Sequence, residues 1–277
     1  MTERAVIGVF DSGIGGLTVW REITRILPDV PTIYLADQAF VPYGERPEAF
    51  VCARTLTCVE WLVEQGCDPV VVACNTASAV ALEAVRHAFP SVGVVGMEPA
   101  VKPAAQQTRT GVVGVLATAV TLRSARYAAL TAQWRASAQI IERACPTWVT
   151  AVETCETNAQ LQPCVEACLV PMLEAGADVI VLGCTHFPFL LPWIERSVEA
   201  WRVAHAAERE VRILDPSPAV ARQVARLWKP RSSPNGTHAL QRFYTTGEAL
   251  RFEQAASFWL GQPVRAASLT SALRVPA

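Results

Sequence analysis

Two stretches decide the fold: Glu64-Gln-Gly-Cys-Asp-Pro-Val-Val-Val-Ala-Cys74 and Glu174-Ala-Gly-Ala-Asp-Val-Ile-Val-Leu-Gly-Cys184. The Glu, the Gly, the Asp, the middle Val and the final Cys coincide between them. In both, we expect a helix to end at the Gly and a buried strand to run to the Cys. Although any two strand–helix units share some features, a Cys at the same point of both favours two similar domains.

Outward from these stretches, short β-branched runs alternate with longer amphipathic segments. We expect strands at residues 5–10, 32–36, 69–73, 92–95, 111–116, 138–143, 179–182 and 212–214, and helices at 17–26, 48–65, 77–88, 122–134, 165–175, 190–205, 218–227 and 249–260. This alternation predicts an α/β fold of two similar domains with mainly parallel sheets, related by a pseudo-twofold axis. Because ligands of open parallel sheets bind beyond the carboxyl ends of the strands, Cys74 and Cys184 are expected to face one interdomain cleft.

The composition is that of a globular chain with a sizeable core. The 277 residues are 51% hydrophobic and carry a formal net charge of -1, which does not favour nucleic-acid binding. Acidic Glu3 and Asp11 interrupt the pattern of a signal peptide, and no apolar run reaches the roughly 18 residues of a membrane span. Nine cysteines, an odd number without an export signal, predict reduced thiols in the cytoplasm.

Each repeated Cys stands in a polar motif, Ala73-Cys-Asn-Thr-Ala77 or Gly183-Cys-Thr-His-Phe-Pro188. Each motif follows a buried strand and opens a helix, whose N-terminus is expected to lower the pKa of the thiol. Asn75, Thr76 and Thr185 offer hydrogen bonds, and backbone N–H groups there suit a carboxylate. The alternative, a Cys that merely fills space, is preferred for six others: Cys52, Cys58, Cys67, Cys155, Cys164 and Cys168.

Further polar residues follow predicted strands. Asp11 and Ser12 open the glycine loop Asp11-Ser-Gly-Ile-Gly-Gly-Leu-Thr18, which has neither Walker nor dinucleotide spacing, and Asp11 is a candidate to relay a proton. His186 is placed to tune Cys184 or to relay a proton. Glu153 follows the apolar run 148–152 and is interpreted either as an orienting partner of His186 or as a solvated carboxylate at a strand end. Tyr43-Gly44 is interpreted either as a tight turn or as a loop that contacts the ligand. Thr118 either caps the following helix or contacts the substrate.

No cofactor or metal is expected. Lys102 and Lys229, the two lysines, do not have the setting of a buried Schiff-base lysine, which argues against pyridoxal phosphate. Cys164 and Cys168 lie one helical turn apart, but no second pair has zinc-ligand spacing. Two thiols that flank one carbon can carry a proton from one face of it to the other without a cofactor.

These motifs, together with Pro42-Tyr-Gly44, Cys145-Pro146 and Phe243-Tyr-Thr-Thr-Gly247, resemble the glutamate racemases of the aspartate/glutamate racemase superfamily nearly end to end. The resemblance implies one domain of residues 1–97 and 209–277, and a second of residues 98–208. It implies that Cys74 and Cys184 are the acid/base thiols, assisted by Asp11 on one side and by His186 with Glu153 on the other. The implied substrate contacts are Asp11, Ser12, Tyr43, Gly44, Asn75, Thr76, Thr118, Thr185 and His186. It further implies D-glutamate supply for peptidoglycan and a homodimer.

Three alternatives stay open at this point. The first is a racemase of aspartate or of both acidic amino acids, since pocket size is not readable from sequence. The second is a thiol redox or cysteine-nucleophile enzyme, which would leave Cys74 idle and lacks a Cys-X-X-Cys turn. The third is binding to DNA gyrase, as for some relatives. The chain departs from the family pattern at Ala117, where Gly is expected, in the proline-rich segment 214–218 and in the tail after Gly261.

Overall fold

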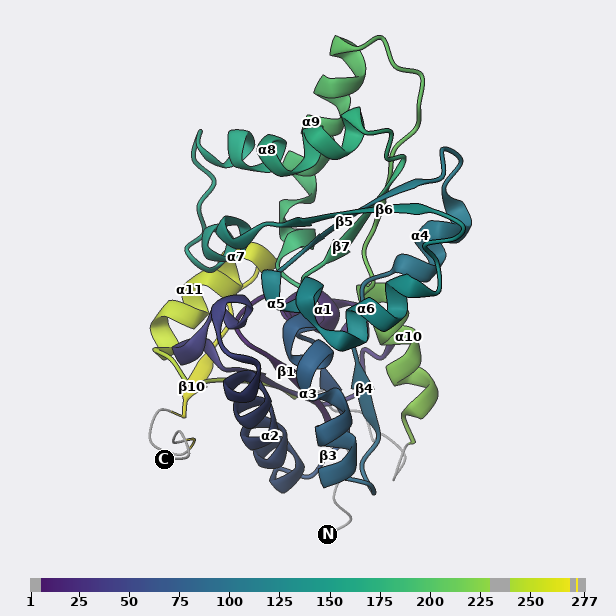
Figure 1. Cartoon of the computed structure of the whole chain (residues 1–277). Helices are drawn as coiled ribbons and strands as arrows, with labels where there is room; N and C mark the ends of the chain where they lie inside the picture. Colours follow the sequence, from purple (N-terminus) through teal and green to yellow (C-terminus); the bar gives the residue numbers. More distant parts are fainter. Residues whose placement is uncertain (1–5, 230–239, 270–272, 274–277) are drawn as a thin grey trace.

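Two parallel sheets form the framework of the molecule (Figure 1). The computed structural model describes residues 6–229, 240–269 and 273. The first sheet has the order β10-β9-β2-β1-β3-β4, with strands Ala266–Ser268, Gln241–Thr245, Thr32–Ala36, Val6–Asp11, Cys67–Val72 and Val94–Gly96. The second has the order β6-β5-β7-β8, with strands Gln139–Ala144, Val112–Ala117, Val179–Gly183 and Arg212–Leu214. Every described strand pair is parallel, which confirms the predicted α/β class.

Helices cover both sheets (Figure 1). The first domain carries α1 (Leu17–Ile26), α2 (Glu48–Glu64), α3 (Asn75–Ala88), α10 (Ser217–Leu227) and α11 (Ala249–Leu260), and the short η1 (Gln38–Phe40) and η2 (Tyr43–Glu45). The second carries α4 (Val101–Gln107), α5 (Ala119–Arg123), α6 (Ala125–Ala132), α7 (Pro146–Glu153), α8 (Leu161–Glu174), η3 (Phe187–Leu190) and α9 (Leu191–Ala204). In the described part of the chain, no helix combines the length and apolar character that crossing a bilayer requires.

The repeat in the sequence corresponds to a repeat in the fold. The order β2-β1-β3-β4 in one sheet matches β6-β5-β7-β8 in the other, so β3 and β7 are equivalent strands. The repeated glycines, Gly66 and Gly176, have φ values of 80° and 101°, a conformation that favours glycine where a helix ends. The repeated Asp68 accepts from the Gly93 N–H at 3.0 Å, and Asp178 accepts from the Arg109 N–H at 2.7 Å. Each Asp thus ties the start of its strand to the loop that enters the neighbouring strand.

The second sheet includes β8, a short strand that follows α9. β8 pairs with β7 at the position that β4 occupies beside β3, so residues up to Leu214 belong to the second sheet. The family resemblance implied that the return to the first domain begins at residue 209. The single helix predicted over 122–134 is two helices, because the extended residue Ser124 ends α5 and caps α6. The strands β9 and β10 were not predicted.

The apolar run before Glu153 is helical, so the strand-end interpretation of Glu153 is wrong. Pro146 stands in the first turn of α7, where proline is favoured, and Trp148, Val149 and Val152 form its buried face. The same apolar core continues from α7 into the first domain, since Trp259 of α11 donates to the Val152 carbonyl at 2.8 Å. Figure 1 shows α11 beside α7, where it packs the first domain against the second.

Candidate active site

The carboxyl ends of four strands, two from each sheet, meet between the domains. Asp11 ends β1, Cys74 lies two residues past β3, Thr118 one residue past β5, and Cys184 one residue past β7. Thr185 donates to the Asp11 carboxylate at 3.0 Å, so the loops after β1 and β7 are in contact. Thr185 follows Cys184 in the sequence, and Ser12, which follows Asp11, contacts Cys74, so the two thiols lie on this pair of contacting loops.

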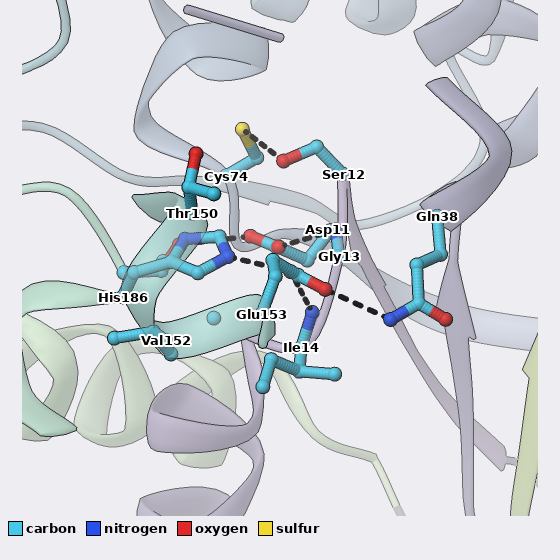
Figure 2. Close-up of polar contacts among 12 residues, drawn as sticks. Asp11, Ser12, Gly13, Ile14, Gln38, Cys74, Thr150, Val152, Glu153 and His186 are labelled. Atoms are coloured by element: carbon cyan, nitrogen blue, oxygen red, sulfur yellow. Dashed lines mark hydrogen bonds and ion pairs between the residues drawn. The ribbon is translucent and has the colours of Figure 1, made fainter. Parts of the chain in front are cut away.

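Cys74 is held by the loop after β1 and by the helix that it caps. Its thiol donates to the Ser12 hydroxyl, with a sulfur–oxygen distance of 3.6 Å (Figure 2). Its sulfur accepts from the Ala77 N–H at 3.4 Å. Asp11 accepts from the Gly13 N–H at 2.9 Å as well as from Thr185. The Cys74 side therefore combines a thiol, a hydroxyl and a carboxylate, all buried.

Cys184 begins a chain of polar groups that ends in the first domain. Its sulfur lies 3.7 Å from His186 Nδ1, and His186 Nε2 lies 2.7 Å from Glu153 Oε1. The same oxygen of Glu153 accepts from the Ile14 N–H at 2.8 Å, and its other oxygen accepts from the Gln38 amide at 2.8 Å (Figure 2). Glu153, which is buried in the second domain, is thus bound by two donors of the first.

The glycine loop lets the first domain approach this chain of groups closely. A Cβ at Gly13 would lie 1.9 Å from Glu153 Oε1, and one at Gly15 would lie 2.3 Å from His186 Nδ1. Neither the Glu153 carboxylate nor the His186 imidazole can move away without breaking its hydrogen bonds. Glycine is required at both positions because the backbone passes directly over the polar side chains.

Short polar side chains also gather between the two domains. The hydroxyls of Thr76 and Thr118 lie 2.9 Å apart, and Thr118 lies 2.9 Å from Thr121. The side chain of Asn75 is buried, and both its oxygen and its nitrogen have no partner among the described residues. A buried amide without partners is costly unless a ligand satisfies it. Asn75 is therefore the clearest candidate for substrate binding among the predicted residues.

The loop of Tyr43 and Gly44 approaches the second domain with its backbone. The Tyr43 hydroxyl donates to Asp37 at 2.5 Å, so this side chain anchors the loop to the residue after β2. Arg54 is fully buried and donates to both oxygens of Asp37, at 2.9 and 2.7 Å. A Cβ at Gly44 would lie 2.7 Å from the Thr118 Cβ, so the loop touches the second domain.

Burial dominates the electrostatics of the site. It raises the pKa of the Cys74 thiol to about 12, an effect that the Asp11 charge reinforces and the Ala77 N–H opposes. The helix N-terminus does lower the pKa of Cys74 through the Ala77 N–H, as expected, but desolvation outweighs this one donor, so the net shift is upward. Burial likewise raises the pKa of Asp11 to about 6, against the opposing charge of His186. For His186 burial acts against the charged form, but Cys184 and Glu153 raise its pKa well above the usual value.

The described residues contain no cluster of three or more His, Cys, Asp or Glu arranged to hold a metal ion. Both lysines are exposed on the surface. The chemistry of the site is that of thiols, carboxylates, hydroxyls and one imidazole.

Sequence reasoning missed Gln38 and Asp37. Gln38 binds Glu153, and Asp37 fixes the Tyr43 loop. They are the first and second residues after the buried strand β2, whose last residue pairs with Asp11 at the end of β1. The rule that sites form beyond strand ends, applied to this strand as well, would have found them.

Comparison with known proteins gives consistent results. The family described as Asp/Glu/Hydantoin racemase matches residues 7–224. A glutamate racemase of Pseudomonas aeruginosa (strain UCBPP-PA14) is 41% identical over 263 residues, covering 94% of this chain and 96% of that protein. A glutamate racemase of Roseiflexus sp. (strain RS-1) is 45% identical over 254 residues, covering 89% of each.

Solved structures give the same result. A glutamate racemase of Bacillus anthracis superimposes with a TM-score of 0.83 at 31% identity, covering 98% of this chain and 99% of that one. The structure of Escherichia coli glutamate racemase in complex with L-glutamate and the activator UDP-MurNAc-ala superimposes with a TM-score of 0.80 at 31% identity. The match covers 95% of this chain and 97% of that one.

Proposed function

The chain belongs to the Asp/Glu/Hydantoin racemase family, and we propose that it interconverts L- and D-glutamate by cofactor-independent proton transfer at the α-carbon. It is an amino-acid racemase. The observation that carries the proposal is the equivalence of Cys74 and Cys184, which follow corresponding strands of two similar sheets. Thiols supplied from two pseudo-symmetric halves are suited to the two faces of one carbon.

In this mechanism one thiolate removes the α-proton while the opposite thiol gives a proton to the other face. The electron pair of the broken C–H bond is held as a carbanion next to the carboxylate and then forms the new C–H bond. Backbone N–H groups and hydroxyl donors stabilise the charge on the carboxylate side. The reverse reaction exchanges the roles of the two sulfurs.

Each thiol has a partner for its proton. Asp11 has a pKa of about 6 and lies on the Cys74 side, where Ser12 accepts from the thiol. His186, held by Glu153, serves Cys184. The α-ammonium group of the substrate would lower the pKa of a nearby thiol, because an adjacent positive charge favours the thiolate.

The substrate contacts we propose come from both domains. Asn75 is the strongest candidate because its buried amide lacks partners, and Thr76, Thr118 and Thr185 add hydroxyl groups. Asp11, Ser12 and His186 complete the set from the two thiol sides. The backbone of Tyr43 and Gly44 would contact the substrate, whereas the Tyr43 hydroxyl donates to Asp37.

The decisive experiment is exchange at the α-carbon of L- and D-glutamate in heavy water without added cofactor. Loss of the α-proton signal together with the appearance of the opposite enantiomer is the expected result. Circular dichroism with L-glutamate and L-aspartate in parallel separates a glutamate racemase from one with broader substrate use. Absence of both exchange and optical change with every acidic amino acid would refute the proposal.

We also propose a cellular role in line with the relatives. D-glutamate would serve peptidoglycan synthesis, the protein would be a homodimer, and the reaction would run in the cytoplasm, where free thiols such as Cys74 and Cys184 stay reduced. Sedimentation tests the dimer. Retention of gyrase subunits by a variant that lacks both thiols would add a binding role.

A further inference from the structure

The carboxylate of Glu153 has two differently used oxygens. Oε1 lies against His186 Nε2 and the Ile14 N–H, while Oε2 accepts from the side-chain amide of Gln38 (Figure 2). We propose that Gln38 is a positioning residue for the Cys184 half of the reaction, because it holds Oε2 and thereby keeps Oε1 on His186. The inference rests on the proposed racemisation and names a residue that the family resemblance did not supply.

Gln38 is itself fixed on the first domain. Its side-chain oxygen accepts from the Thr245 hydroxyl at 3.4 Å, and its Cβ lies so near Gly247 that a Cβ on that glycine would be 3.3 Å away. The preceding residue, Asp37, accepts from Thr246 at 2.9 Å and from the buried Arg54. These contacts fix the position from which the Gln38 amide donates to Glu153.

A cavity beside the pair makes the role of Gln38 specific. A pocket of about 390 Å³ is lined by residues of both domains, among them Gln38, Glu153, Glu248 and Arg251. Gln38 and Glu153 both line this pocket, and the amide occupies a hydrogen-bonding position of Oε2. Without it, water reaches Oε2 and the carboxylate can rotate away from His186. The hydrogen bond between Glu153 and His186 would then weaken, and His186 would be held less firmly beside Cys184.

Two variants test the inference. Gln38→Met keeps the length of the side chain but cannot donate, so kcat should fall on the order of tenfold with little change in KM. Gln38→Glu places a second carboxyl against Glu153. When protonated, the introduced carboxyl donates to Oε2 as the amide does. When ionised, it repels Glu153.

The pH dependence of Gln38→Glu gives the sharpest result. The charged groups that face the introduced carboxyl are Glu153 of α7 and Glu248 and Arg251 near the start of α11. The activity of this variant, divided by that of the wild type at the same pH, should rise as the pH falls and the carboxyl gains its proton. Gln65→Glu, which adds the same charge at the exposed end of α2, is the matched control and should follow the wild type at every pH.

A second readout does not depend on turnover. The His186 Nε2–H proton in its bond to Glu153 should give a downfield NMR signal, assigned by its loss in His186→Asn. We expect this signal in the wild type and in Gln65→Glu, and its broadening or upfield shift in Gln38→Met. An unchanged signal in Gln38→Met overturns the inference even if glutamate is not the substrate. So does a pH-independent activity ratio for Gln38→Glu, or a rise in KM alone, which would mean that Gln38 only assists domain closure. Thermal melting of each variant confirms that it is folded.

Discussion

The Thr185 hydroxyl donates a 3.0 Å hydrogen bond to the Asp11 carboxylate, joining the residue after one thiol to the carboxylate beside the other. The bond crosses between the domains, so the loop that carries Cys184 is held against the carboxylate beside Cys74. It also lowers the pKa of Asp11, although burial raises that pKa to about 6 overall. The site is thus arranged for function at the expense of stability, since a buried carboxylate is ionised at neutral pH.

Asp11 should make the protein less stable as pH rises. Its folded-state pKa is about 6 and its ordinary value is 3.8, so the folded protein holds this proton more tightly than the unfolded chain does. The stabilisation is complete below the ordinary value and is lost as pH rises through about 6, a change of about 3 kcal/mol. Asp11→Asn should therefore gain stability relative to the wild type between pH 4 and 7, measured by urea unfolding. Parallel curves for the two proteins would contradict this.

Asp178 should show the opposite dependence. Burial acts against its ionisation, but hydrogen bonds from Thr108 and from the N–H groups of Arg109 and Thr110 lower its pKa. Its stabilisation is present above the ordinary Asp pKa and is lost as pH falls through the lowered one. Asp178→Ala should cost about 1–3 kcal/mol at pH 7. The deficit should shrink in acid, and a deficit that is constant with pH would mean that the charge plays no part.

Gly13→Ala should abolish activity because its methyl group would collide with Glu153, whereas Gly66→Ala should only lower the free energy of unfolding. The new methyl group at Gly13 would overlap Glu153 Oε1 at 1.9 Å and push the carboxylate away from His186. At Gly66 nothing among the described residues lies within 4 Å, but φ is +80°, so alanine is strained by about 1 kcal/mol. Racemisation and melting temperature of both variants separate the two effects. Full activity in Gly13→Ala would show that the loop can move aside.

The sequence predicted the paired domains because the repeated Gly, Asp and Cys each have a local physical task. Gly66 and Gly176 end helices with positive φ, and each Asp binds a neighbouring loop, so the pattern is visible without knowledge of tertiary contacts. The Cys motifs are visible for the same reason, since a polar run directly follows a buried strand.

What could not be predicted depends on contacts between distant segments. Gln38 and Glu153 are separated by more than one hundred positions, and neither shows its partner in its own surroundings. The pKa of Cys74 depends on how deeply two domains bury it, which a helix N-terminus does not reveal. The short strand β10 (Ala266–Ser268) exists because β9 offers it an edge, not because its three residues favour a strand.

Replacing each thiol singly should separate proton removal from inversion. Cys74→Ser and Cys184→Ser should each lower racemisation on the order of 10²–10⁴-fold, because a serine hydroxyl is a poor acid and base at these positions.

The remaining thiol can still remove the α-proton that faces it and return a solvent deuteron to the same face. Each variant should therefore exchange the α-proton of one enantiomer in heavy water without inverting it, and the two variants should choose opposite enantiomers. Proton NMR of L- and D-glutamate with each variant measures this directly, with Cys67→Ser, a buried thiol at the opposite end of β3 from Cys74, as the control. If both variants exchange the same enantiomer, the two sulfurs do not face opposite sides of the carbon, and a single-thiol scheme must replace the one proposed.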